Sequence, residues 1–362
     1  MKPSSGMCNM RCDYCFYSDE TVKRKQESYG FMSEDTVKNI IRRTLPLAEG
    51  VASYAFQGGE PTLRGLDFFR TVVKLERQYN RARVRIHNAL QTNGFLIDDD
   101  WCQFLKENQF LVGVSIDGTE PVHNKYRHLR NSDESAWSRA AHATELMDKY
   151  KVDYNILTVV NAETAANIKE IYRFYEQRGW RWQQYIACLD PLDEEKGKDP
   201  WSLTPEMYGN FLIDLFEMWY SDSKQRKKPY VRQFENYLGI LLGYLPEACD
   251  QIGVCSAQYV CEADGSVYPC DFYMLDEYRL GNFNEDRLEA IDKRREEIGF
   301  IERSRKLEEE CKSCPYHYLC RGGCQRNRDL TQEGAYRNYF CESYKMFFKE
   351  CLPQLKELAG VK

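Results

Sequence analysis

Three cysteines near the start of the chain have a spacing that suits metal chemistry. Cys8, Cys12 and Cys15 follow the pattern C-x3-C-x2-C and are followed at once by Phe16 and Tyr17. Three thiolates can hold three irons of a four-iron, four-sulfur cube, which leaves the fourth iron open to a small molecule. A zinc knuckle with a fourth ligand from elsewhere would use the same cysteines. The spacing predicts a metal centre and favours a catalytic iron-sulfur cube.

A second group of cysteines lies in the C-terminal third of the chain. Nine of the fifteen cysteines fall between Cys249 and Cys341, which is enough for two sites of four thiolates each. Either iron-sulfur cubes or zinc ions would satisfy this count and would stabilise a segment with few long apolar runs. The ligands that we assign to these two sites are Cys249, Cys255, Cys270, Cys324, Cys311, Cys314, Cys320 and Cys341.

The remaining four cysteines, Cys102, Cys188, Cys261 and Cys351, are expected to be buried as small apolar side chains. Cys261 lies close to the assigned ligands in sequence, so the choice of Cys255 over Cys261 depends on motif spacing alone.

Composition and charge narrow the class of protein. A chain of 362 residues with 43% hydrophobic content can form one or two compact domains. The net charge of −6 argues against a nucleic-acid partner. The sequence has neither a signal-peptide pattern nor a run of about 18 apolar residues, so we expect a cytoplasmic protein with no membrane partner. In that reducing compartment, fifteen cysteines favour metal ligation over disulfides.

The pattern of apolar and polar residues predicts an α/β fold followed by a cysteine-rich domain. In residues 1–222 short apolar runs alternate with helical patterns, which is typical of a parallel sheet. Residues 223–248 are polar at their start and are predicted to be a linker, and residues 249–362 form the metal-organised domain with a C-terminal helix. The expected strands are Tyr54–Gln57, Val84–Gln91, Leu111–Ile116, Tyr154–Val160 and Trp182–Ala187.

Three further local patterns have a physical basis. Ser33 is placed to cap a helix whose apolar face includes Val37, Ile40 and Ile41. A second amphipathic helix is expected over Thr204–Trp219. Between Cys255 and Cys270, the Asp264-Gly265 pair predicts the turn of a β-hairpin.

Several motifs together resemble the radical S-adenosylmethionine (SAM) superfamily. These are the opening cysteines with Phe-Tyr, the segment Gly58-Gly-Glu-Pro61 after a strand, and Ser115-Ile-Asp-Gly118 after another. In the C-terminal part, Gly265-x4-Cys270 and the C-x2-C-x5-C-x3-C run resemble the SPASM domain. The segments Pro269–Tyr273, Leu280–Asn282 and Arg321–Cys324 are most similar to anaerobic sulfatase-maturating enzymes, which convert a cysteine or serine of a sulfatase to Cα-formylglycine.

The resemblance implies a partial (β/α)6 barrel with a SPASM extension, three [4Fe-4S] clusters and SAM. One cluster would bind SAM, the other two would be auxiliary, and an external one-electron donor such as flavodoxin or ferredoxin would supply the electron. A sulfatase polypeptide would be the client. The residues implied to line the SAM site are Tyr14, Gly58, Gly59, Glu60, Ser115, Arg127 and Leu189. Those implied to face the peptide are Tyr17 and Gln57.

Asp271, directly after Cys270, resembles the general base of this family. After a hydrogen atom leaves the substrate Cβ, loss of the thiol or hydroxyl proton makes the carbon radical a strong reductant, and an electron can leave toward an auxiliary cluster. A carboxylate is ionised at neutral pH and can accept that proton.

Two alternatives stay open at the level of sequence. The same machinery could crosslink or epimerise a ribosomally made peptide, although the context of Asp271 argues against this. A zinc-stapled binding protein without enzymatic activity is the other. The chain also departs from the family, because only Met1–Met7 precede Cys8, and a first barrel strand is expected there to be short or trimmed.

Overall fold

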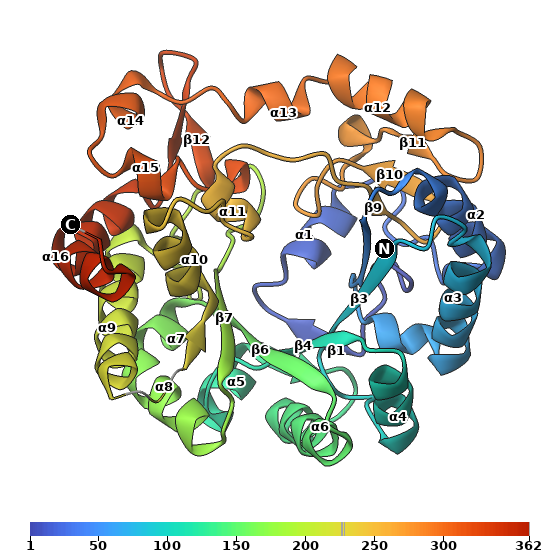
Figure 1. The fold of residues 1–362 in the computed structure, drawn as a ribbon, viewed down its shortest axis with the longest axis horizontal. Coiled ribbons are helices and arrows are strands. Elements are labelled where there is room, and N and C mark those ends of the chain that lie inside the picture. Colours follow the sequence, from blue (N-terminus) through green and yellow to red (C-terminus); the bar gives the residue numbers. More distant parts are fainter. Residues whose placement is uncertain (226, 228, 362) are drawn as a thin grey trace. The chain divides into compact units, whose positions relative to one another are not determined.

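The computed structural model describes residues 1–225, 227 and 229–361. Arg226 and Lys228, within the predicted linker, and Lys362, at the end of the predicted C-terminal domain, lie outside the described residues. The chain divides into two units that alternate along the sequence (Figure 1). The first unit comprises Met1–Ile116, His123–Asn155 and Gln258–Ile298, and the second comprises Asp117–Val122, Ile156–Ala257 and Gly299–Lys362. The domain boundaries predicted at 222 and 249 stay a prediction.

The first unit contains a parallel sheet in the order β2 (Val51–Phe56), β3 (Arg85–Thr92) and β4 (Leu111–Ser115). Helices α2 (Glu34–Thr44), α3 (Leu66–Tyr79), α4 (Asp99–Glu107) and α6 (Ala136–Tyr150) belong to the same unit. The ring of Phe69 on α3 packs edge-on against Phe56 and Trp101, each with a centroid distance of 5.2 Å. As predicted, α2 begins after Ser33, whose hydroxyl accepts a hydrogen bond of 3.0 Å from Thr36 N.

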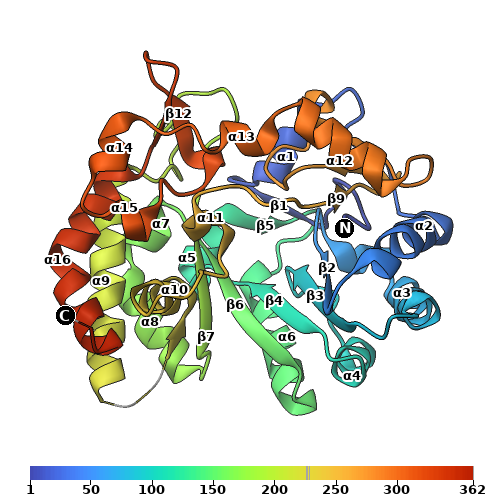
Figure 2. The same cartoon turned by 45° about the horizontal axis from the view of Figure 1, so that its top comes forward.

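A two-stranded antiparallel sheet carries part of the cysteine motif. Strand β1 (Met10–Cys12) pairs with β5 (Arg127–Leu129), so that Cys12 lies opposite Arg127. The two strands run side by side in Figure 2. Helix α1 (Phe16–Val22) follows β1 directly, and α5 (Glu120–Tyr126) precedes β5.

The predicted hairpin around Asp264-Gly265 is confirmed. Strands β9 (Val260–Cys261), β10 (Ser266–Tyr268) and β11 (Gly281–Asn282) form an antiparallel sheet with β10 in the middle. Gly265 has φ of +89°, which side-chain-bearing residues rarely adopt, and Asp264 Oδ1 accepts a hydrogen bond of 2.9 Å from Ser266 N. Helix α12 (Leu288–Glu297) follows β11.

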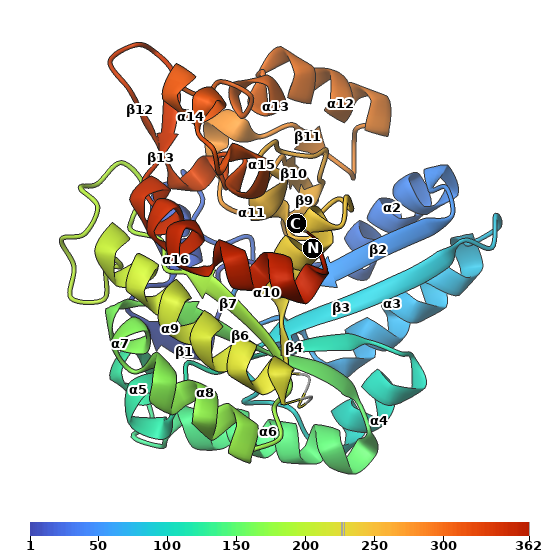
Figure 3. The same ribbon diagram turned by 60° about the vertical axis from the view of Figure 1, so that its left-hand side comes forward.

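The second unit contains a parallel sheet and the cysteine-rich segment. Its strands are β7 (Trp182–Ala187), β8 (Tyr230–Val231) and most of β6 (Asp153–Val160), with β7 between the other two. Helices α9 (Pro205–Lys224) and α16 (Cys341–Ala359) lie side by side (Figure 3), and the rings of Phe216 and Phe347 join them at 5.6 Å. The shorter elements are α7 (Ala162–Ala166), α8 (Ile168–Gln177), α10 (Arg232–Leu241), α11 (Cys249–Ile252), α13 (Phe300–Arg303), α14 (Glu309–Ser313), α15 (His317–Cys320), β12 (Arg328–Leu330) and β13 (Tyr336–Asn338).

All five strands expected from the sequence are present, and α9 covers the second predicted amphipathic helix. The segment predicted as a linker contains β8 and α10 as well as connecting residues. Cys102, Cys188, Cys261 and Cys351 are buried, as predicted. Within the described part of the chain, no helix is both long and apolar enough to cross a membrane.

Candidate active site

Residues Cys8–Cys15 form a segment that we call the cysteine loop, and its thiols lie beside hydrogen-bond donors that suit thiolate ligands. Cys8 Sγ accepts a hydrogen bond of 3.3 Å from Met10 N, and the guanidinium of Arg127 lies 4.0 Å from Cys12 Sγ. Cys15 caps the start of α1, and its backbone N–H donates to Cys12 O at 3.2 Å. Burial raises the pKa of Cys8 to about 12, so this thiol keeps its proton unless a metal cation replaces it. The three thiols are the donor set that the predicted cube requires, and their role as its ligands stays a prediction.

The Gly-Gly-Glu-Pro segment is hydrogen-bonded to the residues that lead into Cys8. Gly59 N donates to Ser5 O and Glu60 N donates to Met7 O, each at 2.8 Å. A Cβ atom on Gly59 would lie 1.9 Å from Met7 O, a distance at which atoms clash. Glycine is required here because two backbone segments touch, and this contact sets the path of the chain into the cysteine loop.

The Glu60 carboxylate is bound inside the protein. It accepts hydrogen bonds from Thr62 N and Thr62 Oγ1, from Thr92 Oγ1 and from Asn93 N, at 2.6 to 3.0 Å. Its side chain is buried, and burial raises its pKa above the usual value. Because these four donors occupy both oxygens, Glu60 ties the end of β2 to the end of β3. We therefore expect Glu60 to position the SAM-binding backbone and Gly58–Gly59 to make the contact.

The other residues expected near SAM in the first unit lie on neighbouring elements. Ser115 ends β4, and its hydroxyl accepts a hydrogen bond of 3.0 Å from Gln91 Nε2. Arg127 stacks on Tyr14, with 5.4 Å between its Cζ atom and the ring centroid. Leu189 follows β7 in the second unit, and its predicted role remains a prediction.

Asp271 forms an ion pair with Lys2 in the first unit. The Lys2 side chain is 1% exposed and the Asp271 side chain 18% exposed, so Asp271 is partly exposed while its partner is buried; the oxygen that faces Lys2, Oδ1, is itself buried. The same ammonium lies 4.0 Å from the centroid of Tyr17, two residues beyond Cys15. Gln57 is joined to this region through its backbone N–H, which donates to Met1 O at 3.0 Å.

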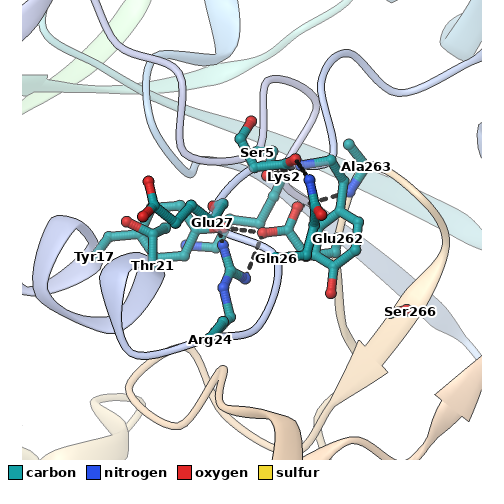
Figure 4. Close-up of polar contacts among 12 residues, drawn as sticks. Lys2, Ser5, Tyr17, Thr21, Arg24, Gln26, Glu27, Glu262, Ala263 and Ser266 are labelled. Atoms are coloured by element: carbon teal, nitrogen blue, oxygen red, sulfur yellow. Dashed lines mark hydrogen bonds and ion pairs between the residues drawn. The ribbon is translucent and has the colours of Figure 1, made fainter.

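A buried network anchors Tyr17 (Figure 4). Its hydroxyl donates to Glu262 Oε1, and Arg24 Nη1 donates to the same oxygen at 2.9 Å. The side chains of Arg24 and Glu262 are both fully buried. Burial and the adjacent Glu262 raise the pKa of Tyr17 well above its usual value, so its hydroxyl remains a donor. The network connects Tyr17 of α1 to Glu262, the residue that follows β9 in the hairpin that leads to Asp271.

Sequence reasoning did not find Lys2, Arg24 or Glu262. A single lysine or arginine is usually a surface residue, and no local pattern marks a pair such as Arg24 and Glu262, which are 238 positions apart. The identity of Asp271 gave no hint of its partner either.

The thiols of the second unit form two groups. Cys311, Cys314, Cys320 and Cys341 line one pocket. Cys324 lies near Cys249 and Cys255. Burial, followed by the nearby Cys249, Asp250 and Cys255, raises the pKa of Cys324 to about 12. Arg326 N donates to Cys324 Sγ at 3.4 Å.

The division of the eight assigned cysteines between two auxiliary sites stays a prediction. Cys270, which is also an assigned ligand, belongs to the first unit. The Cys261 thiol is buried and donates instead to Tyr259 O at 3.5 Å.

Comparisons with known proteins agree with this arrangement. Residues 3–175 match the radical SAM superfamily, and residues 249–315 match an iron-sulfur cluster-binding domain, SPASM. A cysteine-type anaerobic sulfatase-maturating enzyme of Clostridium perfringens is 43% identical, over 99% of this chain and 97% of its own length. A serine-type enzyme of Klebsiella aerogenes is 31% identical, over 100% of this chain and 88% of its own.

A solved structure has nearly the same fold. It is described as native anSMEcpe with bound AdoMet and Cp18Cys peptide, and it superposes with a TM-score of 0.93 at 43% identity over 99% of this chain and 97% of that one. The partial (β/α)6 barrel and the SPASM extension are thus the architecture of the chain. Agreement in sequence and fold over almost the full length makes this chain a member of the anaerobic sulfatase-maturating enzymes, within the radical SAM superfamily.

Proposed function

We propose that this chain oxidises a cysteine of a sulfatase polypeptide to Cα-formylglycine without oxygen. The higher identity to a cysteine-type relative, 43% against 31% for a serine-type one, supports cysteine as the target. The observation that carries the proposal is the position of Asp271: a partly exposed carboxylate held by buried Lys2, in the same unit as the cysteine loop. Family membership decides against a zinc-stapled binding protein.

The assigned cysteine ligands indicate which cofactors the chain would bind. Cys8, Cys12 and Cys15 would hold the cube that binds SAM, and the other eight assigned cysteines would hold two auxiliary cubes. When bound, these groups supply the 5′-deoxyadenosyl radical that removes a hydrogen atom from the substrate Cβ. Around them, the protein excludes water, orients the peptide and accepts a proton.

Asp271 is the proton acceptor in this proposal. The substrate thiol must lose its proton once the Cβ hydrogen has gone, and a fixed carboxylate is suited to take it. Lys2 holds the carboxylate in place, because a charged pair with one buried partner has few alternative geometries. Tyr17 and Gln57 would contact the peptide beside it, with Tyr17 itself held by Glu262.

Two further parts of the proposal concern the surroundings of the enzyme. The electron for each turnover would come from an external one-electron donor such as flavodoxin or ferredoxin. We also propose a cytoplasmic location, since eleven thiols assigned as ligands need a reducing compartment.

The test uses reconstituted enzyme and a short peptide from a sulfatase, with the target residue either cysteine or serine and deuterated at Cβ. We expect formylglycine from the cysteine peptide at a higher rate than from the serine peptide. In Asp271→Asn, deuterium should still appear in 5′-deoxyadenosine, while the rate of aldehyde formation falls about 10²- to 10⁴-fold. Asp67→Asn, which removes a carboxylate that is 92% exposed on α3, is the matched control and should behave like the parent.

Aldehyde formation by Asp271→Asn at the parent rate would show that the base lies elsewhere. A preference for the serine peptide would contradict the choice of cysteine and leave the reaction class intact. SAM cleavage without any aldehyde from either peptide, in the parent enzyme, would reject the proposed substrate.

A further inference from the structure

The sheet formed by β1 and β5 includes Cys12 and has one buried face and one exposed face. Along β1, Met10 is buried, Arg11 is exposed and Cys12 is partly buried. Along β5, Arg127 and Leu129 are buried and His128 is exposed. Strand residues alternate between faces, so the inner face carries Cys12 and Arg127, which approach each other to 4.0 Å, and the outer face carries Arg11 and His128.

The outer face is hollowed and contains cationic side chains. A hollow of about 520 Å³ is lined by Arg11, Asp13, His128, Leu129, Arg130 and Asn131. These residues include two arginines and one carboxylate, that of Asp13, whose Oδ2 lies 3.4 Å from His128 Nε2. The chain as a whole has a net charge of −6, so this local excess of positive charge is opposite to the overall charge.

Two residues that line the hollow belong to the cysteine loop. Arg11 and Asp13 are the residues on either side of Cys12, so a molecule resting on them comes within one residue of a predicted cluster ligand. Arg130 reaches the same loop, because its Nε donates to Met10 O at 3.2 Å and its backbone N–H donates to Asn9 O at 2.9 Å.

We propose that this face is the docking site of a small acidic protein that donates one electron at a low reduction potential. The face consists of Arg11, Asp13, His128, Arg130 and Asn131. The inference rests on the proposed function, which requires one electron for each SAM cleaved. In the step proposed here the carrier loses one electron and the site held by Cys8, Cys12 and Cys15 gains it; no bond to the carrier forms. Charge complementarity supports this occupant, because a face with an excess of arginine attracts an acidic carrier that the net negative charge of the chain would otherwise repel.

Two reductants with different docking needs test the inference. Reduced flavodoxin must bind, whereas dithionite is a small molecule that needs no surface. The readout is 5′-deoxyadenosine formed by the full-length, cluster-loaded enzyme with saturating SAM and peptide. In Arg11→Glu and in Arg11→Glu/His128→Glu, we expect the flavodoxin-driven rate at limiting flavodoxin and low salt to fall about tenfold or more, as for loss of electrostatic steering. The dithionite-driven rate should stay at the parent value.

Arg70→Glu is the matched control, since it reverses the same charge at an exposed site on α3 of the same unit. We expect it to leave both rates unchanged, and we expect salt to slow flavodoxin-driven turnover of the parent more than that of Arg11→Glu.

A parent-like flavodoxin-driven rate in the double variant would overturn the docking site. Equal loss with both reductants would also overturn it, because Arg11 would then support the cluster loop itself. These results are independent of the fate of the peptide: a parent enzyme that forms 5′-deoxyadenosine with dithionite but no formylglycine rejects the proposed substrate, and the docking measurement still stands.

Discussion

The substitution Glu262→Gln probes the network that connects the cysteine loop to the hairpin. Glutamine keeps the volume of the side chain and an oxygen that can accept from Tyr17, but it removes the negative charge. Arg24 is then a fully buried cation that has lost the carboxylate facing it, while Nη2 still donates to a neutral acceptor, Glu27 O, at 2.9 Å. The perturbation therefore isolates the charge of one carboxylate.

The magnitude follows from the burial of the pair. Removing one partner of a buried ion pair typically costs about 3–5 kcal/mol, because the other charge is left without compensation. For a domain of 150–250 residues, each kcal/mol lowers Tm by about 2–4 °C, so we expect a decrease of about 6–20 °C. In Arg24→Gln/Glu262→Gln no charge is stranded, and the loss should be smaller than in either single variant.

The assay is thermal unfolding of the cluster-loaded enzyme under anaerobic conditions, with iron content measured before and after. Formylglycine production at a temperature well below the transition is measured alongside. A decrease in Tm below about 2 °C for Glu262→Gln, or a double variant less stable than both single ones, would refute the view that Arg24 and Glu262 are a tightly coupled buried pair.

Three other outcomes follow from the same structure. Burial raises the pKa of Glu76 to about 7, so its protonated form favours folding; that stability is present below pH 4.5 and is lost as the pH rises through 7. The free energy of unfolding of Glu76→Gln should therefore exceed that of the parent by about 3 kcal/mol at pH 8 and differ little from it at pH 4.5. A difference in the free energy of unfolding that does not change with pH would contradict this. Gly59→Ala should lose SAM cleavage and N-terminal cluster iron, because its Cβ clashes with Met7 O; parent-like iron and SAM cleavage would show that the contact can relax. Cys12→Ala should abolish SAM cleavage by either reductant, and SAM cleavage at the parent rate would remove the N-terminal site from the reaction.

Much of the fold could be predicted because the signals were local. The N-cap at Ser33 and the Asp-Gly turn at Gly265 depend on residues within a few positions, and both formed as expected. Strand β8 was missed because it has only two residues, Tyr230 and Val231, and is defined by its partner β7 rather than by its own pattern.

Residues of the candidate site could be predicted from sequence where they belong to a motif. Residues whose position depends on tertiary packing could not. The cysteine spacing and Asp271 were identified from sequence. Glu60 is expected at the cofactor, which stays a prediction; the hydrogen bonds that its carboxylate accepts from Thr62, Thr92 and Asn93 could not be predicted, because Thr92 ends another strand. Lys2 became visible only once the fold placed it against Asp271.

The contact between Gly59 and Met7 has a consequence for the life of the enzyme in air. The approach to Cys8 is held by backbone hydrogen bonds from Gly59 to Ser5 and from Glu60 to Met7, none of which involves iron. Because these bonds do not depend on the cysteine ligands, we expect the segment from Ser5 to Met7 to keep its backbone path when oxygen destroys the cluster. Iron and sulfide supplied to the oxidised enzyme, without an unfolding step, should then restore SAM cleavage.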